Sequence, residues 1–193
     1  MSERVLNTAG PALPAVPAAD PAAFRSLMAA HPAGVAVVTA TDLDGSPWGM
    51  TCSSVSSVAL DPPTLLVCLR RASPTLDAVL RSGTFAVNLL HDGARAAADL
   101  FASGDPDRFD RVVWRLGAGS SGPHLTDSAH SVADCRVSGT VGVGDHTVIF
   151  GEVQHIEGPH EETPRPLLYG LRQYWSLQSA VVGDDGAGRA RRR

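Results

Sequence analysis

The chain has 193 residues, of which 44% are hydrophobic and 19% are charged, and its net charge is −4. These values are typical of one globular domain, and they argue against a strongly basic nucleic-acid-binding surface and against a fully disordered chain. No apolar run is long enough to span a membrane. The cysteines, Cys52, Cys68 and Cys135, are too few and too scattered for a disulfide framework or a zinc site with four ligands. We therefore expect a soluble, cytoplasmic protein that binds neither nucleic acid nor membrane.

The two ends differ in composition from the middle of the chain. Residues 1–19 are rich in Pro and Ala and show no hydrophobic period, which predicts a flexible arm. Residues 181–193 end in several arginines and predict a disordered, solvated tail, with phosphate or nucleic-acid contact as the weaker alternative. The folded domain is expected over residues 20–180.

The first elements follow from capping and turn signals. Asp20–Pro21 is an N-cap followed by proline at the first helical position, and it predicts a short helix that ends near His31. The β-branched run 34–41 predicts a strand, and Asp44–Gly45 predicts the hairpin turn after it. The Ser-rich stretch Trp48–Asp61 is then expected as the returning strand.

The rest of the chain continues this pattern of strands and a few short helices. Strands are expected over 64–69, 84–90, 132–143 and 146–156, and helices over 74–83 and 95–102. Residues 105–114 show only a weak pattern. About six strands with hairpin connections and few helices predict a mainly β fold, in which a closed antiparallel sheet has helices over its openings.

The stretch Trp48–Asp61 is unusual for a core strand because it carries five hydroxyl side chains. Serine hydroxyls bind nearby backbone groups and compete with the hydrogen bonds of a sheet. One interpretation is that the hydroxyls contact a polar ligand. The other is that they face water from a half-exposed strand, and residue types alone favour this second interpretation.

Two further segments could contact a ligand. Ser73–Pro74–Thr75 begins a helix, and the backbone N–H groups there, with Arg70 or Arg71 before them, could bind an anion; ordinary helix capping is the alternative. His146 follows the turn Gly144–Asp145 at the start of a strand, where it could face a cavity mouth or could simply be a surface residue.

Other motifs are weaker. Gly117–Gly122 matches the G-x-G-x-x-G pattern, but no helical stripe follows it, so a dinucleotide-binding loop of that kind is not expected. The histidines do not form the close pairs that metals favour, and no serine has the flanking glycines of a hydrolase nucleophile.

Many short pieces in one order, from about residue 23 to residue 177, resemble the short-chain flavin reductase family, the reductase partners of two-component flavin-dependent monooxygenases. The pieces that carry the resemblance are Phe24-Arg25-x-x-Met28, Gly34-Val35-x-Val37-Val38-Thr39, Gly49-Met50-Thr51-x-Ser53-Ser54, Ser57-Val58, Leu60-Asp61-Pro62-Pro63, Ser73-x-Thr75, Ser82-Gly83-x-Phe85-x-Val87-Asn88, Asp107-Arg108-Phe109, Gly144-Asp145-His146 and Pro166-Leu167-Leu168-Tyr169 followed by Tyr174.

The resemblance implies a split β-barrel homodimer that reduces free FMN or FAD with NADH or NADPH and supplies the reduced flavin to a partner monooxygenase. It implies cofactor contacts at Met50, Thr51, Cys52, Ser53, Ser54, Ser57, Arg70, Ser73, Thr75, Asn88, Leu89, Phe101, Phe109, His146 and Tyr169. Among these, His146 is the residue expected to act on the nicotinamide, with Tyr169 on the same side.

Two alternatives stay open at this stage. A split-barrel oxidoreductase could keep its flavin fixed and act on a small organic substrate, or the chain could bind flavin or haem without catalysis. No general acid, metal or covalent nucleophile is required for flavin reduction, because the flavin carries its own electron chemistry. The protein's task is then to position the two rings for hydride transfer.

Overall fold

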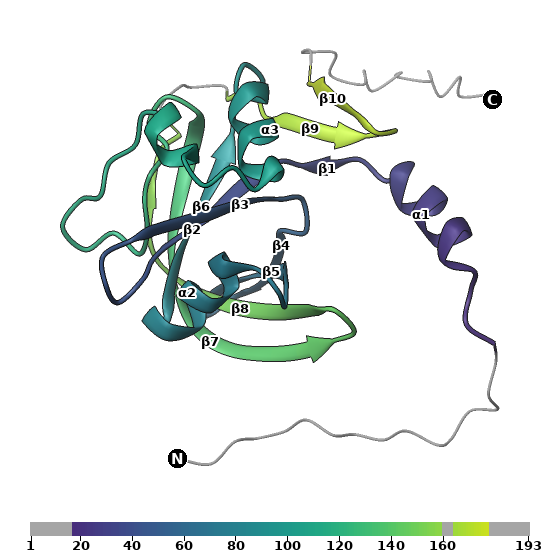
Figure 1. Cartoon of the computed structure of the whole chain (residues 1–193), viewed down its shortest axis with the longest axis horizontal. Coiled ribbons are helices and arrows are strands. Elements are labelled where there is room, and N and C mark those ends of the chain that lie inside the picture. Colours follow the sequence, from purple (N-terminus) through teal and green to yellow (C-terminus); the bar gives the residue numbers. More distant parts are fainter. Residues whose placement is uncertain (1–16, 160–163, 178–193) are drawn as a thin grey trace, which may run out of the picture.

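The computed structural model describes residues 17–159 and 164–177. Figure 1 shows a β-rich body with one helix, α1, standing apart from it. The predicted tail, and nearly all of the predicted arm, lie outside the described residues, so the domain limits at 19 and 180 stay predictions. No helix in the described part of the chain is long and apolar enough to cross a membrane.

The body is built on one antiparallel sheet of seven strands. Their order across the sheet is β3 (Pro47–Cys52), β2 (Ala36–Thr41), β6 (Thr84–Leu90), β7 (Ala129–Val143), β8 (His146–Glu157), β5 (Pro63–Arg70) and β4 (Ser56–Leu60). A second sheet of three strands contains β1 (Ala33–Gly34), β9 (Leu167–Gly170) and β10 (Gln173–Ser176). The prediction of a mainly β fold of the split-barrel type is confirmed.

The large sheet curls, but its hydrogen bonding does not close. β3 and β4 are its two edges, whereas the sequence suggested a closed sheet. Buried residues from β2, β3, β5, β6 and β8 nevertheless form one core cluster, which includes Val38, Val67, Phe85 and Ile149. The edge of β3 therefore stays free of a neighbouring strand while the interior is packed.

Helix α2 (Pro74–Ser82) fills the gap beside the edge strand β3. Its N-cap is Ser73, whose side chain accepts a hydrogen bond from the Thr75 N–H, and Pro74 occupies the first helical position. Gly83 ends the helix with a φ of 73°, the left-handed conformation that favours glycine. Leu76 and Val79 point into the core, so the sequence-predicted helix is confirmed.

Helix α3 (Arg95–Ser103) and the short 3₁₀ helix η1 (Arg108–Arg111) cover the other side of β3. The rings of Phe101 and Phe109 pack edge to face, with centroids 5.1 Å apart. A Cβ on Gly49 would come within 2.9 Å of the Phe101 ring. Glycine at this position thus lets α3 lie directly against the edge strand.

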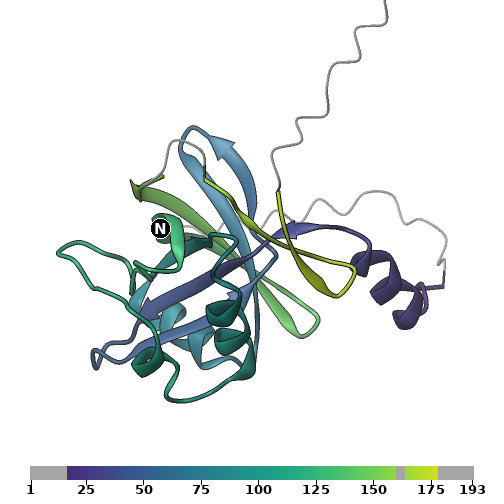
Figure 2. The same cartoon turned by 90° about the horizontal axis from the view of Figure 1, so that it is seen from above.

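Helix α1 (Pro21–Ala29) contributes nothing to this core. It buries none of its residues, and the Phe24 and Leu27 side chains are 56% and 67% exposed. The two views in Figures 1 and 2 agree that α1 stands clear of the body, beyond the small sheet. Asp20 caps it as predicted, but the helix ends at Ala29 rather than near His31.

The expectation of one returning strand over Trp48–Asp61 is wrong. β3 ends at Cys52, and β4 pairs with β5 instead of β2. The break falls at Ser54, whose hydroxyl accepts a hydrogen bond from the Cys68 N–H at 3.0 Å. A serine that binds a backbone group of another strand in this way interrupts the ladder it would otherwise continue.

Two further segments complete the comparison with the sequence. The hairpin β9–β10 was not predicted, because its strands are four residues long and its turn residues, Leu171 and Arg172, have positive φ angles that their residue types do not suggest. Gly117–Gly122 lies in a loop with no helix after it, as expected.

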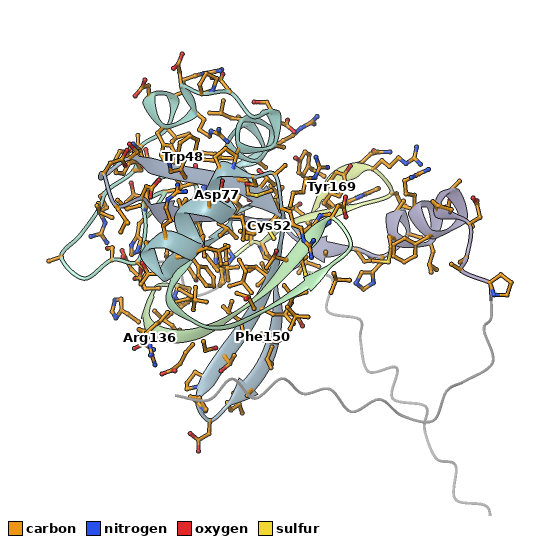
Figure 3. All side chains as sticks on the ribbon, turned by 60° about the horizontal axis from the view of Figure 1, so that its bottom comes forward. Trp48, Cys52, Asp77, Arg136, Phe150 and Tyr169 are labelled. Carbon is orange, nitrogen blue, oxygen red and sulfur yellow. The ribbon has the colours of Figure 1, made fainter. Side chains whose placement is uncertain are left out.

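Figure 3 shows Trp48, Cys52 and Asp77 on the side of β3 and α2, and Arg136 and Phe150 along β7 and β8.

Candidate ligand-binding site

A cavity of about 670 Å³ opens where the edge strand β3 faces the end of β5 and the start of α2. We call it the main cavity. Most of the predicted site residues line it, namely Met50, Thr51, Cys52, Ser53, Ser54, Arg70, Ser73, Thr75, Phe101 and His146. Segments far apart in the sequence thus meet in one space of a size that suits a cofactor.

The other predicted residues lie elsewhere. Ser57 is exposed on β4, and Leu89 packs beside the core. Phe109 contacts Phe101 and lines a neighbouring cavity, and Tyr169 lines another. Asn88 is fully buried and does not line the main cavity.

The hydroxyls of the Ser-rich wall hold the wall in place. The Thr51 hydroxyl donates to the Ala98 carbonyl of α3 at 2.6 Å, and the Ser54 hydroxyl bonds both backbone groups of Cys68 on β5. These bonds tie β3 to the elements on either side of it. Small side chains and a strand edge then leave the backbone close to the cavity, where a flat ring can approach it.

One end of the main cavity is positively charged. Arg108 is only 9% exposed and donates from Nη1 to the Gly49 carbonyl at 2.8 Å. Arg70 and the N-terminus of α2, at Ser73–Thr75, line the same cavity. A helix N-terminus and a buried guanidinium both favour an anion, so this end suits a phosphate.

His146 lies near this charged end. It is the first residue of β8 and pairs across the sheet with Arg70. Its Nδ1 lies 2.8 Å from Oδ1 of Asp145, and this hydrogen bond lowers the pKa of the Asp145 carboxyl. The Asp145 carboxylate therefore contacts the imidazole of a residue that lines the main cavity.

The Cys52 thiol of the cavity does not resemble a nucleophile. Cys52 is buried, and burial raises the pKa of its thiol, which favours the unreactive neutral form. Within residues 17–159 and 164–177, no cluster of His, Cys, Asp or Glu is arranged to hold a metal ion.

Comparisons with known proteins show which family the chain resembles. The family model described as flavin reductase like domain matches residues 28–178. The chain is 50% identical over 159 residues to a flavin reductase (NADPH) of Lentzea aerocolonigenes, with 82% of this chain and 89% of that protein covered.

The chain belongs to the flavin reductase family. It is also 36% identical to HsaB of Rhodococcus jostii, the reductase subunit of a flavin-dependent monooxygenase, with 85% of this chain and 82% of that protein covered. Among solved structures, an NADH:FAD oxidoreductase of Streptomyces globisporus in complex with NAD and FAD fragments has a TM-score of 0.76 and 30% identity; 86% of this chain and 99% of that chain are covered.

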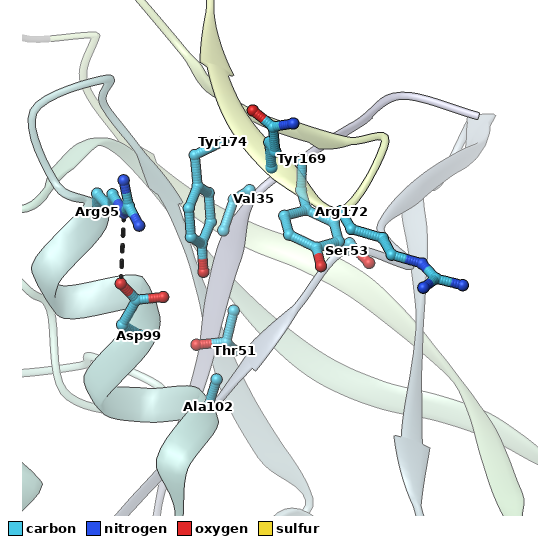
Figure 4. Close-up of a pocket in the computed structure, with 10 residues that line it drawn as sticks. Val35, Thr51, Ser53, Arg95, Asp99, Ala102, Tyr169, Arg172 and Tyr174 are labelled. Carbon is cyan, nitrogen blue, oxygen red and sulfur yellow. Dashed lines mark ion pairs between the residues drawn. The ribbon is translucent and has the colours of Figure 1, made fainter. Parts of the chain in front are cut away.

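In this flavin reductase fold, a second space adjoins the main cavity. Figure 4 shows the residues that line this second space. This side cavity has a volume of about 600 Å³ and shares Thr51 and Ser53 with the main cavity. Tyr169 and Tyr174 line its wall, and the centroids of their rings lie 5.3 Å apart. Burial and a hydrogen bond to Asp99 raise the pKa of Tyr174 to about 12, so its phenol stays protonated.

The family resemblance implies that His146 and Tyr169 lie on one side of the ligand. The structure lines the main cavity with His146 and the side cavity with Tyr169, and Thr51 and Ser53 belong to both. Their shared role therefore stays a prediction.

Two site residues were missed as functional candidates. Arg108 was noticed only as part of the motif Asp107-Arg108-Phe109, because its burial against β3 depends on the packing of η1. The sequence indicates Arg95 only as the start of a helix, yet its guanidinium lies 5.4 Å from the Tyr174 ring centroid and pairs with Asp99 at 3.5 Å. A helix start and a distant tyrosine give no joint signal in sequence.

Proposed function

We propose that the protein is an NAD(P)H:flavin oxidoreductase that takes free FMN or FAD as its substrate. The observation that supports this most strongly is the main cavity itself, in which a buried, positively charged end adjoins the uncharged edge of β3. A flavin nucleotide has the matching form, an anionic phosphate at one end and a flat, uncharged ring at the other. The residues present therefore fit the group.

In this proposal, the phosphate binds at Ser73–Thr75 with Arg70 and Arg108, and the ring lies along the wall Met50–Ser54. Bound flavin supplies the redox chemistry, accepting a hydride from the nicotinamide. The chain holds the ring by backbone contacts, and the hydroxyls of Thr51 and Ser54 keep that backbone in place. Rigid positioning of this kind is the main contribution a protein can make to a hydride transfer.

The hydride donor is assigned to the open side of the ring. His146 can hydrogen-bond the carboxamide or a phosphate of the nicotinamide nucleotide, because it lines the main cavity. The side cavity, with Tyr169 and Tyr174, offers a flat aromatic wall for the rest of that nucleotide. No proton transfer by the protein is needed for this step.

Steady-state oxidation of NADPH and NADH, followed by absorbance with free FMN or FAD added, tests the proposal. We expect turnover that rises with the concentration of free flavin and then saturates. A separate monooxygenase would consume the reduced flavin, as in the system to which HsaB belongs. Turnover only with an organic substrate, or binding of flavin without turnover, would refute the proposal and favour one of the two alternatives.

We also propose that the protein is a homodimer. Helix α1 buries nothing, and all residues of β4 are exposed, with the Leu60 side chain at 89%. A groove of about 910 Å³ between α1 and Ser53–Ser56 includes Tyr169 and Arg172. Apolar surface of this extent favours a partner, and a second copy would cover it and enclose the site.

Light scattering after size exclusion tests the dimer. Leu27→Asp places a charge on the exposed face of α1 and is expected to yield monomers. Leu43→Asp is the matched control, because Leu43 is 77% exposed in the turn between β2 and β3. A wild-type monomer, or a dimer that Leu27→Asp leaves intact, would refute this assignment.

A further inference from the structure

The main cavity continues beyond its charged end into a third space. This outer cavity has a volume of about 390 Å³ and shares Pro74, Gly104 and Arg108 with the main cavity. It is bounded further out by Trp48 and Asp107. A ligand whose phosphate lies at the charged end therefore has open space on its far side.

Arg108 stands at the junction of the two spaces. Arg108 is buried, and among the described residues no carboxylate lies within ion-pair distance of it; the nearby Asp105 pairs with Arg111, and the charge of Arg108 is a minor cause of the lowered pKa of Asp105. A buried cation without a carboxylate in direct contact is costly unless an anion neutralises it. A planar guanidinium reached from two cavities suits a diphosphate, which presents oxygens on both sides.

The outer cavity also has the chemistry of a nucleoside site. Trp48 packs against the core cluster and is one of the residues that line the cavity, and an indole is a flat surface on which a nucleobase can stack. The carboxylates of Asp107 and Asp110 lie on the same wall. Carboxylates accept hydrogen bonds from sugar hydroxyls and repel further phosphates.

We propose that the outer cavity binds the adenosine half of a dinucleotide flavin, with Arg108 on the diphosphate and Trp48 under the adenine. This inference rests on the proposed function and makes it specific, because it selects FAD over FMN as the preferred substrate. A mononucleotide would leave the outer cavity without a ligand and would use only one side of Arg108.

Calorimetric titration of the full-length protein with FAD and with FMN tests this. We expect FAD to bind at least about tenfold more tightly, the effect of one stacked base. Trp48→Leu should weaken the binding of FAD but not of FMN, so that the two dissociation constants lie within about twofold of each other. Trp48→Phe keeps an aromatic ring and should preserve most of the preference for FAD. Asp107→Ala, at an exposed position, should weaken FAD binding by roughly threefold and leave FMN binding unchanged.

Three outcomes would overturn the inference. These are equal affinities of the wild-type protein for FAD and FMN, a preference that neither Trp48→Leu nor Asp107→Ala reduces, or equal weakening of both flavins by these variants. If Trp48→Leu does not fold, the Asp107→Ala and wild-type titrations still decide. Failure of the proposed function is a different result, in which neither flavin binds or supports NAD(P)H oxidation.

Discussion

Polar side chains in the main cavity and in the buried cluster around Asn88 differ in how many of their hydrogen bonds the protein itself supplies. The Asn88 amide nitrogen donates to the carbonyls of Val37 and Pro123 and to the Thr39 hydroxyl, and its oxygen accepts from the Leu125 N–H at 2.8 Å. Arg108, by contrast, donates to one carbonyl and faces open space. Polar groups satisfied within the protein hold the fold, and those that face a cavity are available to a ligand.

The largest expected effect tests the structural half of this comparison. Asn88→Ala removes a fully buried amide and leaves the groups that it bonds without this partner. We expect the free energy of unfolding to fall by about 3 kcal/mol, because several backbone groups lose a hydrogen bond. Urea unfolding measures this. Thr140→Ser, at an exposed site on β7, is the control and should change stability by less than about 0.5 kcal/mol. A stable Asn88→Ala protein that no longer binds flavin would place Asn88 in the ligand site instead.

The next largest effect tests the polar side chains that face the main cavity. Arg108→Gln removes a charge-assisted hydrogen bond to phosphate and should weaken FMN binding by about 2 kcal/mol, or roughly thirtyfold. The binding of riboflavin, which lacks the phosphate, should not weaken. Arg108→Lys keeps the charge and should retain part of the affinity. Fluorescence titration gives the dissociation constants. Equal losses for FMN and riboflavin would mean that Arg108 acts only by supporting β3.

A smaller effect is expected at the hydride-donor side. His146→Ala should raise the KM for the nicotinamide nucleotide about fivefold, the value of one hydrogen bond of about 1 kcal/mol, and should leave the dissociation constant of the flavin nearly unchanged. Steady-state kinetics with varied NADPH and NADH give the first quantity, and titration gives the second. Equal changes in both, or no change in either, would remove His146 from this role.

The smallest effect concerns pH. His124 is buried between Asp134 and Glu157, each 3.0 Å from one of its ring nitrogens, and the hydrogen bond to Asp134 above all raises the pKa of His124. The stabilisation from the charged imidazole is therefore complete below its ordinary pKa of about 6.5 and is lost as pH rises through the raised value.

Thermal unfolding across pH measures this loss. As pH rises above about 6.5, the melting temperature of the wild-type protein should fall by more than that of His124→Gln, in which the titrating group is absent. Parallel curves for the two proteins would show that His124 is not charged in the folded state.

Much of the fold could be predicted from the sequence, because the decisive signals were local. Asp20–Pro21 and Ser73–Pro74 each begin a helix, and the turn at Gly144–Asp145 joins two long strands. The break in the Ser-rich stretch was not predictable, since it depends on the bond between Ser54 and Cys68 on another strand. Local periodicity carries no information about such a partner.

The candidate site could be predicted from the sequence only in part. Ordered motifs indicated Met50–Ser54, Ser73 and His146, and the structure brings these together. Asn88 matched the same motifs, but only the packing of residues 123–125 against β6 shows that its amide is fully used. Whether a polar side chain is satisfied is a property of the folded chain, so sequence alone could not separate Asn88 from the wall of the cavity.

A crystal structure of the full-length protein with bound flavin tests the central claim most directly. The account predicts the phosphate at Ser73–Thr75 and Arg108, and the ring along Met50–Ser54 with one face open toward the side cavity. Flavin bound elsewhere, or bound with its phosphate turned away from Arg108, would contradict the division between satisfied and ligand-facing polar groups.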